Sequence, residues 1–188
     1  GYDNNARADF LGYTETNGLQ NSFKTFQTSK LTTTDIEKLK VDEWCFDNSV
    51  TSTYTYECDI DGDGTTEQCT DEYYGASTRI ETNKKPSLKC TGTKLTKFKD
   101  NTDMYVGTLT ADEMSFAGAD GSTNYNYYLM NTYAKDNGLY WWSLSPDCFF
   151  GVEDGEDGAF YLDSRGRLNS YYVYSDYFVD GYIYSRPA

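Results

Sequence analysis

Large apolar residues recur at short intervals between Tyr140 and Ala188, and this recurrence restricts the fold more than any other feature of the chain. The apolar residues alternate with stretches of Tyr, Asp, Ser and Gly, and eight of the nineteen tyrosines lie in this segment. Because Tyr and the β-branched residues favour strands, we expect short strands joined by turns. The expected core anchors are Trp141, Trp142, Leu144, Pro146, Phe160, Leu162 and Leu168.

The tyrosines of this segment allow two interpretations. Tyr is a stiff, amphipathic side chain that adds contact area at low entropic cost, and Ser, Gly and Asn add adaptable hydrogen bonds, so binding loops use this mixture. Tyr is also a good strand former, so the same residues could simply build a sheet. The sequence favours a binding face, in which the anchors form an inner set and the other aromatic residues point outward.

Helical patterns lie in two parts of the chain. Residues 5 to 39 look mostly helical, since Leu19, Phe23 and Phe26 recur at helical spacing and TTTDIEKLK offers a Thr or Asp N-cap. A further helix is expected in TADEMSFAGA, with Thr110 as its N-cap, two acidic residues in its first turn and a Gly at its end.

From Trp44 onward, the pattern changes to short strands and loops. Residues 73–90 are expected to form two strands around a Pro-containing turn, and residues 104–109 another strand. A hairpin is expected in AFYLDSRGRLNSYYVY, with its turn at residues 164–166, and VDGYIYSRP supplies a closing strand. Two early helices and many short antiparallel strands indicate an α+β fold. Residues 1–40 would form an N-terminal helical segment, and residues 41–188 the main domain.

Charge and composition exclude several classes of function. The formal net charge is −14, which repels phosphate backbones and anionic membrane surfaces, so no nucleic-acid partner is expected. No apolar run is long enough to span a bilayer, so no direct membrane insertion is expected. The chain has no histidine, which removes Ser-His-Asp and Cys-His catalysis, imidazole-bound zinc and His-ligated haem.

Five cysteines indicate a disulfide framework rather than a metal or redox motif, because none of them forms C-x-x-C. Cys58 and Cys69 bracket a tight acidic loop and are a natural pair. Cys45 and Cys90 would then form an outer, nested bridge and leave Cys148 over. Four cysteines allow three connectivities, so nesting is a preference. A reduced cytosolic protein with scattered thiols is the alternative.

The acidic loop between Cys58 and Cys69 has the spacing of a calcium site. Residues 58–72 read CDIDGDGTTEQCTDE, which reproduces the D-x-D-x-D-G start of a calcium loop. The twelfth position is Thr70 rather than Glu, and no flanking helices are expected. A calcium-stabilised surface loop is therefore favoured over an EF-hand, and a solvated acidic turn without an ion is the alternative. The candidate ligands are Asp59, Asp61, Asp63, Thr65, Glu67 and Asp71.

Several segments, in a fixed order, resemble a family of surface proteins of gut Firmicutes and Mollicutes. They are WCFDNSV, STRIETNKKPSLKC, VGTLTADEMSFAG, NYNYYLMN, YWWSLSP, GAFYLDSRGRL and the terminal SRPA, and they cover about residues 40 to 188. The C-terminal layout also resembles the C-type lectin fold, in the version shared by formylglycine-generating enzymes and by the variable proteins of diversity-generating retroelements. The resemblance implies a ligand-binding or adhesive surface displayed outside a bacterial cell.

The resemblance also implies which residues would vary and contact a ligand. They are Asp147, Phe149, Phe150, Val152, Asp154, Tyr171, Tyr172, Tyr174, Asp176, Tyr177, Phe178 and Tyr182. Two features of such folds are missing. The E-P-N or Q-P-D calcium signature of lectins is absent, and only Cys148 lies in the C-terminal region, whereas the catalytic relatives need a cysteine pair. Neither calcium-dependent sugar binding at that site nor that catalytic activity is therefore expected.

Three functions remain in competition. The first is a non-enzymatic adhesin or receptor-binding domain for a protein or glycan on a host, microbial or phage surface. The second is the head of a pilin-like assembly, since the stretch from Asn4 to Phe23 faintly resembles the segment that follows the membrane helix of pilins. The third is a glycan hydrolase with two carboxylates. We expect a secreted or cell-surface domain, trimmed of its export signal or anchor.

Overall fold

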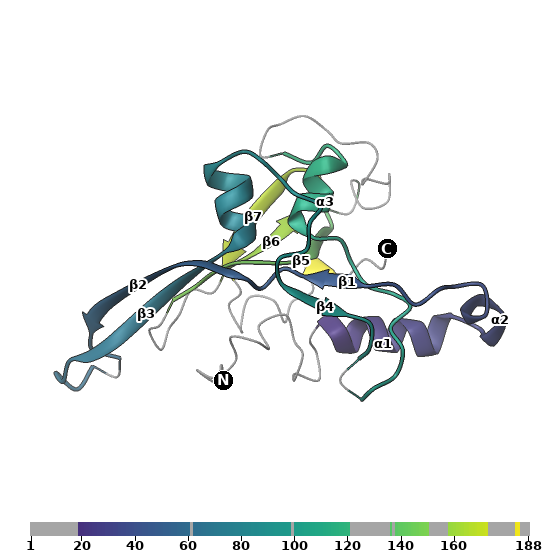
Figure 1. The fold of residues 1–188 in the computed structure, drawn as a ribbon, viewed down its shortest axis with the longest axis horizontal. Coiled ribbons are helices and arrows are strands. Elements are labelled where there is room, and N and C mark those ends of the chain that lie inside the picture. The colour runs from purple at the N-terminus through teal and green to yellow at the C-terminus, as the bar shows by residue number, and fades with distance from the viewer. Residues whose placement is uncertain are drawn as a thin grey trace.

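A computed structural model shows a curled, mostly antiparallel sheet with few helices, and describes residues 19–60, 62–98, 100–120, 136, 138–150, 158–172 and 183–184 (Figure 1). The sheet has the strand order β2-β3-β5-β6-β7, and β8 pairs with β5 in parallel. A separate two-stranded ribbon joins β1 to β4. The strands are β1 (Trp44–Phe46), β2 (Val50–Cys58), β3 (Glu67–Tyr74), β4 (Thr93–Leu95), β5 (Tyr140–Phe149), β6 (Gly158–Leu162), β7 (Leu168–Tyr172) and β8 (Ile183–Tyr184).

The helices in the described part of the chain are short. They are α1 (Leu19–Lys30), α2 (Thr33–Ile36), the π-helix η2 (Ser77–Thr82) and α3 (Ala111–Phe116). Thr32 caps α2 and Thr110 caps α3, each in a capping box with an acidic residue three positions later. The α+β class and both N-caps predicted from the sequence are thus confirmed. None of these helices has the length and hydropathy of a membrane span.

Two hydrophobic cores lie on opposite faces of β5 and β6. This arrangement results from the alternation of side chains along a strand, which sends Ala159 to one face and Phe160 to the other. In Figure 1, α3 and η2 lie above these strands, whereas α1 and the β1–β4 ribbon lie on the other side. The first core contains Phe23, Phe46, Leu95, Phe98, Met104, Val106, Leu144 and Ala159. The second contains Ala76, Ala111, Met114, Ala119, Trp141, Phe160, Leu162 and Leu168.

The predicted anchors of the C-terminal segment are buried, apart from Trp142, which is half-buried against the first core. The predicted hairpin is also present, with β6 and β7 joined by a turn in which Gly166 has a φ of 78°. A positive φ at this position favours Gly, because L side chains meet steric hindrance there. Asp163 accepts hydrogen bonds from the backbone N–H groups of Arg165 and Arg167 and holds the turn closed.

Three predicted strands are wrong, and one of them is the strand expected after the Pro-containing turn, because residues 87–90 form no strand. Ser77–Thr82 forms η2 instead of a strand, because Arg79 must face a buried polar network while its neighbour Ile80 packs against the second core. Adjacent side chains of a strand would point to opposite faces. Residues 104–109 form no strand either. Their backbone groups hydrogen-bond to side chains or to isolated backbone groups instead of forming a ladder. For example, the Tyr105 N–H donates to Gln27 Oε1.

The predicted boundary at residue 40 does not separate two structural units. Phe23 of α1 is fully buried in the first core, beside Phe46 and Leu95 from the β1–β4 ribbon. Gln27 also ties α1 to the segment after β4, since its Nε2 donates to the Asp103 carbonyl. Residues 19–30 therefore belong to the folded body. The rest of the predicted N-terminal segment, before residue 19, lies outside the described residues.

Strands β2 and β3 extend away from the two cores as a hairpin (residues 50–74), which projects to the left in Figure 1. β3 pairs with β5 only at Glu72 and Tyr73. Most side chains of β2 are exposed on both of its faces. The hairpin is thus stabilised chiefly by its own ladder and by the Cys58–Cys69 disulfide near its tip.

Candidate functional site

The structure describes only part of the predicted ligand-binding set. Asp147 and Phe149 lie in β5 with 9% and 8% of their surface exposed. The prediction that these two face outward is therefore corrected, because β5 is the central strand between the two cores. Phe150 follows β5 and is half-buried. Tyr171 and Tyr172 belong to β7, but their side chains are outside the described structure. Also outside it are Val152, Asp154, Tyr174, Asp176, Tyr177, Phe178 and Tyr182.

Phe150 leads to a row of aromatic rings that the sequence did not indicate. Its ring meets that of Tyr73 edge to face, with 6.2 Å between ring centroids. Tyr73 lies opposite Ser52 in the β2–β3 register, so its side chain shares one face of the hairpin with Tyr54 and Tyr56. The rings of Tyr54 and Tyr56 stack at 5.7 Å. We call Tyr54, Tyr56, Tyr73 and Phe150 the aromatic stripe.

The aromatic stripe is accessible and lies in acidic surroundings. Tyr54 is 64% exposed and Tyr73 is 37% exposed. The Tyr56 hydroxyl donates to Asp71 Oδ1 at 3.1 Å. Desolvation raises the pKa of Tyr56, and the hydrogen bond to Asp71 raises it further. Residues 50–74 contain no Lys or Arg, and their seven acidic residues are Glu57, Asp59, Asp61, Asp63, Glu67, Asp71 and Glu72.

The predicted calcium loop forms the tip of this hairpin. Its carboxylates accept backbone N–H groups: Asp59 from Gly64 at 2.9 Å, Asp63 from Thr65 at 2.6 Å, and Glu67 from Ile60 at 3.2 Å. Asp71 lies four residues beyond Glu67 in β3, roughly 13 Å along the strand. Asp71 is therefore removed from the candidate ligand set. Asp61 lies outside the described residues, which contain no group of three or more metal-ligating side chains.

A carboxylate pair lies where η2 meets β5 and β7. Ser77 and Ser170 donate to Glu81 at 3.3 and 3.0 Å. Burial raises the pKa of Asp147, and the negative charge of Glu81 raises it further. Asp147 Oδ1 is buried and has no hydrogen-bond partner among the described residues. The raised pKa means that Asp147 holds its proton to a higher pH than an ordinary Asp does.

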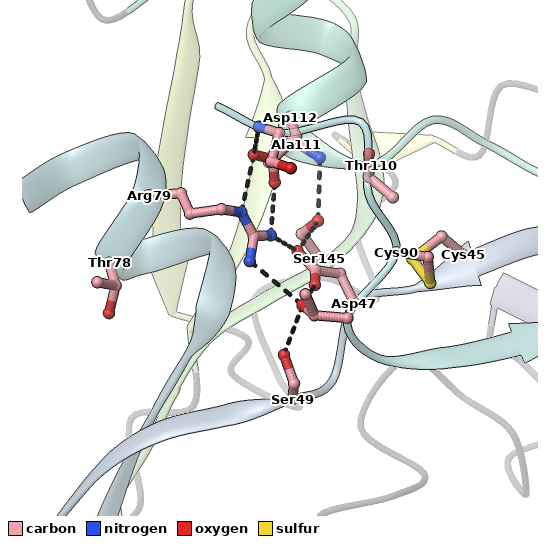
Figure 2. Close-up of polar contacts among 12 residues, drawn as sticks. Cys45, Asp47, Ser49, Thr78, Arg79, Cys90, Thr110, Ala111, Asp112 and Ser145 are labelled. Carbon is pink, nitrogen blue, oxygen red and sulfur yellow. Dashed lines mark hydrogen bonds and ion pairs between the residues drawn. A yellow bond between two sulfur atoms is a disulfide. The ribbon is translucent and has the colours of Figure 1, made fainter. Parts of the chain in front are cut away.

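A buried polar network centred on Arg79 joins four parts of the fold. Arg79 donates from Nε and Nη2 to the two carboxylate oxygens of Asp112 at 2.9 and 2.6 Å, and from Nη2 to Asp47 (Figure 2). Ser145 of β5 donates to Asp47 at 3.4 Å and accepts the N–H of Ala111 at 3.0 Å. The network therefore fixes η2, α3, β5 and the chain after β1 against one another.

The electrostatics of this network identify it as structural. Burial raises the pKa of Asp47, although the positive charge of Arg79 opposes the rise. Hydrogen bonding to Asp112 raises the pKa of Arg79, so the guanidinium stays charged. Both carboxylates are almost fully buried, so the network offers little surface to a ligand. From the sequence, Asp112 was assigned only to the first turn of α3, and Arg79 and Asp47 had no role.

Both predicted disulfides are present, in the nested arrangement. Cys45 pairs with Cys90 and Cys58 pairs with Cys69. The outer bridge lies beside the Arg79 network (Figure 2). Cys148 takes no part in a disulfide and is buried in β5. Two disulfides agree with an oxidising, extracellular setting.

Comparisons with known proteins add no relative to these observations. No family model matches the chain, and no match was found among curated proteins or among solved structures. A function for this protein must therefore be inferred from its own surface and from the chemistry of the described residues.

Proposed function

We propose that this chain is an extracellular ligand-binding domain of a bacterial surface protein, with a C-type lectin-like fold. Two disulfides support the extracellular setting. The α+β architecture, with few helices and mostly antiparallel strands, is compatible with that fold. Its ligand would be a protein or glycan on a host, microbial or phage surface.

The aromatic stripe is the observation that carries this proposal. Soluble domains rarely leave several aromatic rings aligned on an exposed surface unless that surface meets a partner. Tyr combines a large apolar ring with a polar tip and loses little rotamer entropy when it is buried in a complex, so it is enriched in binding surfaces. Because Phe150 belongs to the set implied by the resemblance, the stripe would continue the proposed C-terminal face onto the hairpin.

The stripe is tested by replacing two of its exposed rings. In the Tyr54→Ala/Tyr73→Ala variant, we expect the free energy of unfolding to change by less than about 1 kcal/mol, since exposed side chains contribute little. Binding to an array of glycans and of extracted surface proteins should fall at least about tenfold. Phe116→Ala removes an exposed ring from α3, whose exposure of 57% lies between those of Tyr54 and Tyr73, and is the matched control. Unchanged binding in the double variant would refute this role.

The C-terminal tyrosines are tested separately. Replacing Tyr172, Tyr174, Tyr177 and Tyr182 by Ala should leave thermal stability nearly unchanged if they form an outward-facing set. Unfolding of this variant would show that they are core residues. Diversification by a retroelement further requires a near-identical template repeat and a reverse-transcriptase gene near the coding sequence, and the idea is abandoned if the source genome lacks them.

Hydrolysis of glycans is the second candidate, because Asp147 and Glu81 form a carboxylate pair with unequal environments. A buried acid with a raised pKa beside an exposed carboxylate is the pattern of a general acid and its partner. Burial of Asp147 limits its access to a substrate, which ranks this candidate second. Cleavage of aryl glycosides that is lost in Asp147→Asn would establish it, and inactivity on a broad panel would end it.

Calcium binding at the hairpin tip is retained as part of the proposal, with Asp59, Asp61, Asp63, Thr65 and Glu67 as the remaining candidate ligands. The alternate spacing of these oxygens suits a hard cation. Isothermal titration of the metal-stripped protein should give calcium heat at up to about millimolar concentration, the range of extracellular sites. Asp63→Asn should weaken that heat, and its absence in the parent would end the idea.

A further inference from the structure

The outer edge of the nine-residue strand β2 has no other strand beside it in the described part of the chain. β2 ends the strand order of the sheet, and among the described residues only β3 pairs with it. Each alternate residue of an edge strand presents one N–H and one C=O away from its neighbour. Such a row is a template for another extended chain.

β2 lacks most of the features that protect sheet edges. Natural proteins block an exposed edge with Lys, Pro, short strands, bulges or a covering segment. The sequence VTSTYTYEC contains neither Lys nor Pro, and its irregularity lies at the base, between Val50 and Ser52. Most of its residues are Val, Thr or Tyr, and these residue types favour strand pairing.

The charge of the hairpin decides which kind of chain fits this edge. Seven acidic residues and no basic ones lie within residues 50–74. A second copy of this hairpin would bring like charges together, which disfavours pairing of β2 with itself. A Lys- or Arg-rich strand would instead lie beside Glu57 of β2, with Asp71 and Glu72 of β3 two strand spacings away, roughly 10 Å, on opposite faces of the sheet. Its cationic groups could also lie over the ring of Tyr54.

We propose that the outer edge of β2 binds an extended, Lys/Arg-rich peptide segment of a protein partner, which adds to the sheet as a further strand. Main-chain groups at the edge of β2 would hydrogen-bond to the peptide backbone. The acidic residues and the aromatic stripe would favour Lys and Arg side chains in the peptide. This inference rests on the proposed function and names the partner class for the hairpin surface.

The test uses a labelled, end-blocked nine-residue peptide of alternating Lys and Val, with fluorescence anisotropy as the readout. We expect saturable binding that weakens as salt rises from about 50 to about 200 mM. The same peptide with every backbone nitrogen methylated keeps its charge but loses the N–H donors of both of its edges, so it should bind at least about tenfold more weakly. A Glu-Val peptide should not bind.

Two protein variants separate strand addition from simple charge attraction. Thr55→Lys places a cation within β2, whereas Thr65→Lys makes the same charge change at the hairpin tip. Strand addition predicts that Thr55→Lys weakens binding at least about tenfold more than Thr65→Lys. Hydrogen exchange of residues 51–57 should slow when the peptide is bound. Circular dichroism and thermal unfolding establish that both variants are folded.

Several results would overturn the proposal. They are absence of peptide binding, equal binding of the N-methylated peptide, or equal effects of the two Thr→Lys variants. A concentration-dependent dimer that Thr55→Lys abolishes would make a second copy the occupant and equally refute it. If glycans or proteins bind in a Tyr54-dependent way while the Lys-Val peptide does not, the proposed function survives and strand addition fails. If no ligand depends on Tyr54, both fail.

Discussion

Arg79 shows how much a single side chain contributes to this fold. It neutralises two buried carboxylates at once, and a buried charge left without its partner is costly. Arg79→Leu should therefore lower the free energy of unfolding by about 3–5 kcal/mol in denaturant titrations. Lys94→Ala, which breaks an exposed ion pair with Glu43, is the matched control and should cost less than about 1 kcal/mol. Equal effects would contradict the structural role of the network.

Asp147 gives the protein a specific pH dependence. Its pKa in the folded state is raised above the ordinary value of 3.8. At pH values between 3.8 and the raised pKa, the folded protein holds a proton on Asp147 that the unfolded chain has lost. The free energy of unfolding therefore rises as the pH falls through this range. Asp147→Asn should therefore be more stable than the parent near neutral pH, and the difference should vanish below pH 3.8. A less stable variant at neutral pH would contradict this account, in which burial disfavours the charged form of the Asp147 carboxyl.

Predictions for single residues succeeded where the interacting residues are close in sequence and failed where they are distant in sequence. Thr110 was predicted as an N-cap because it directly precedes a helical pattern with acidic residues in its first turn, and the structure adds a capping box with Glu113. Asp112 lies two residues after Thr110, but its partner Arg79 is 33 residues away, and no local pattern shows that pairing. Asp147 was misplaced because the resemblance assigned it to an outward face, whereas its burial is imposed by the central position of β5.

The two disulfides should differ in what they stabilise. Cys45–Cys90 spans 45 residues and joins β1 to the chain before β4, within the body of the fold. Its removal as Cys45→Ser/Cys90→Ser should cost about 2–5 kcal/mol of global stability. Cys58→Ser/Cys69→Ser opens a span of 11 residues in the projecting hairpin. It should speed hydrogen exchange chiefly within residues 50–74 and leave the cores protected.

Chemical denaturation combined with hydrogen exchange distinguishes these outcomes. Equal losses of global stability in the two double variants would mean that the hairpin and the body unfold as one unit. Faster exchange in α3 or β6 after removal of Cys58–Cys69 would lead to the same conclusion. Either result would contradict the description of the hairpin as a separately stabilised element.

For helices and strands, local sequence patterns predicted that an element is present better than they predicted whether it is a helix or a strand. The β6–β7 hairpin and α3 were predicted because turn and cap residues stand at fixed offsets. The sequence STRIET was predicted as a strand before a Pro-containing turn, yet it folds as η2 because Arg79 and Ile80 both need buried partners. π-Helical turns are rare and often found at functional sites, and η2 carries both Arg79, the centre of the buried network, and Glu81 of the carboxylate pair.

For the whole molecule, the order of helical and strand patterns predicted an α+β fold, but not the projection of the β2–β3 hairpin. Nothing in the sequence VTSTYTYEC states that both faces of the strand remain exposed, because exposure depends on where the other strands end. The aromatic stripe was missed for the same reason. Tyr54 and Tyr73 are far apart in sequence and become neighbours only through the β2–β3 register.

The central claim is that this hairpin serves binding and is dispensable for folding. Thr53 and Glu72 face each other in the register, so residues 54–71 can be replaced by a two-residue Asn-Gly turn. The decisive measurement is thermal unfolding of this shortened protein beside the parent. We predict a cooperative transition within a few degrees of the parent's, because both cores lie in other elements. Loss of the cooperative transition would show that the hairpin is part of the folding unit and would contradict the claim.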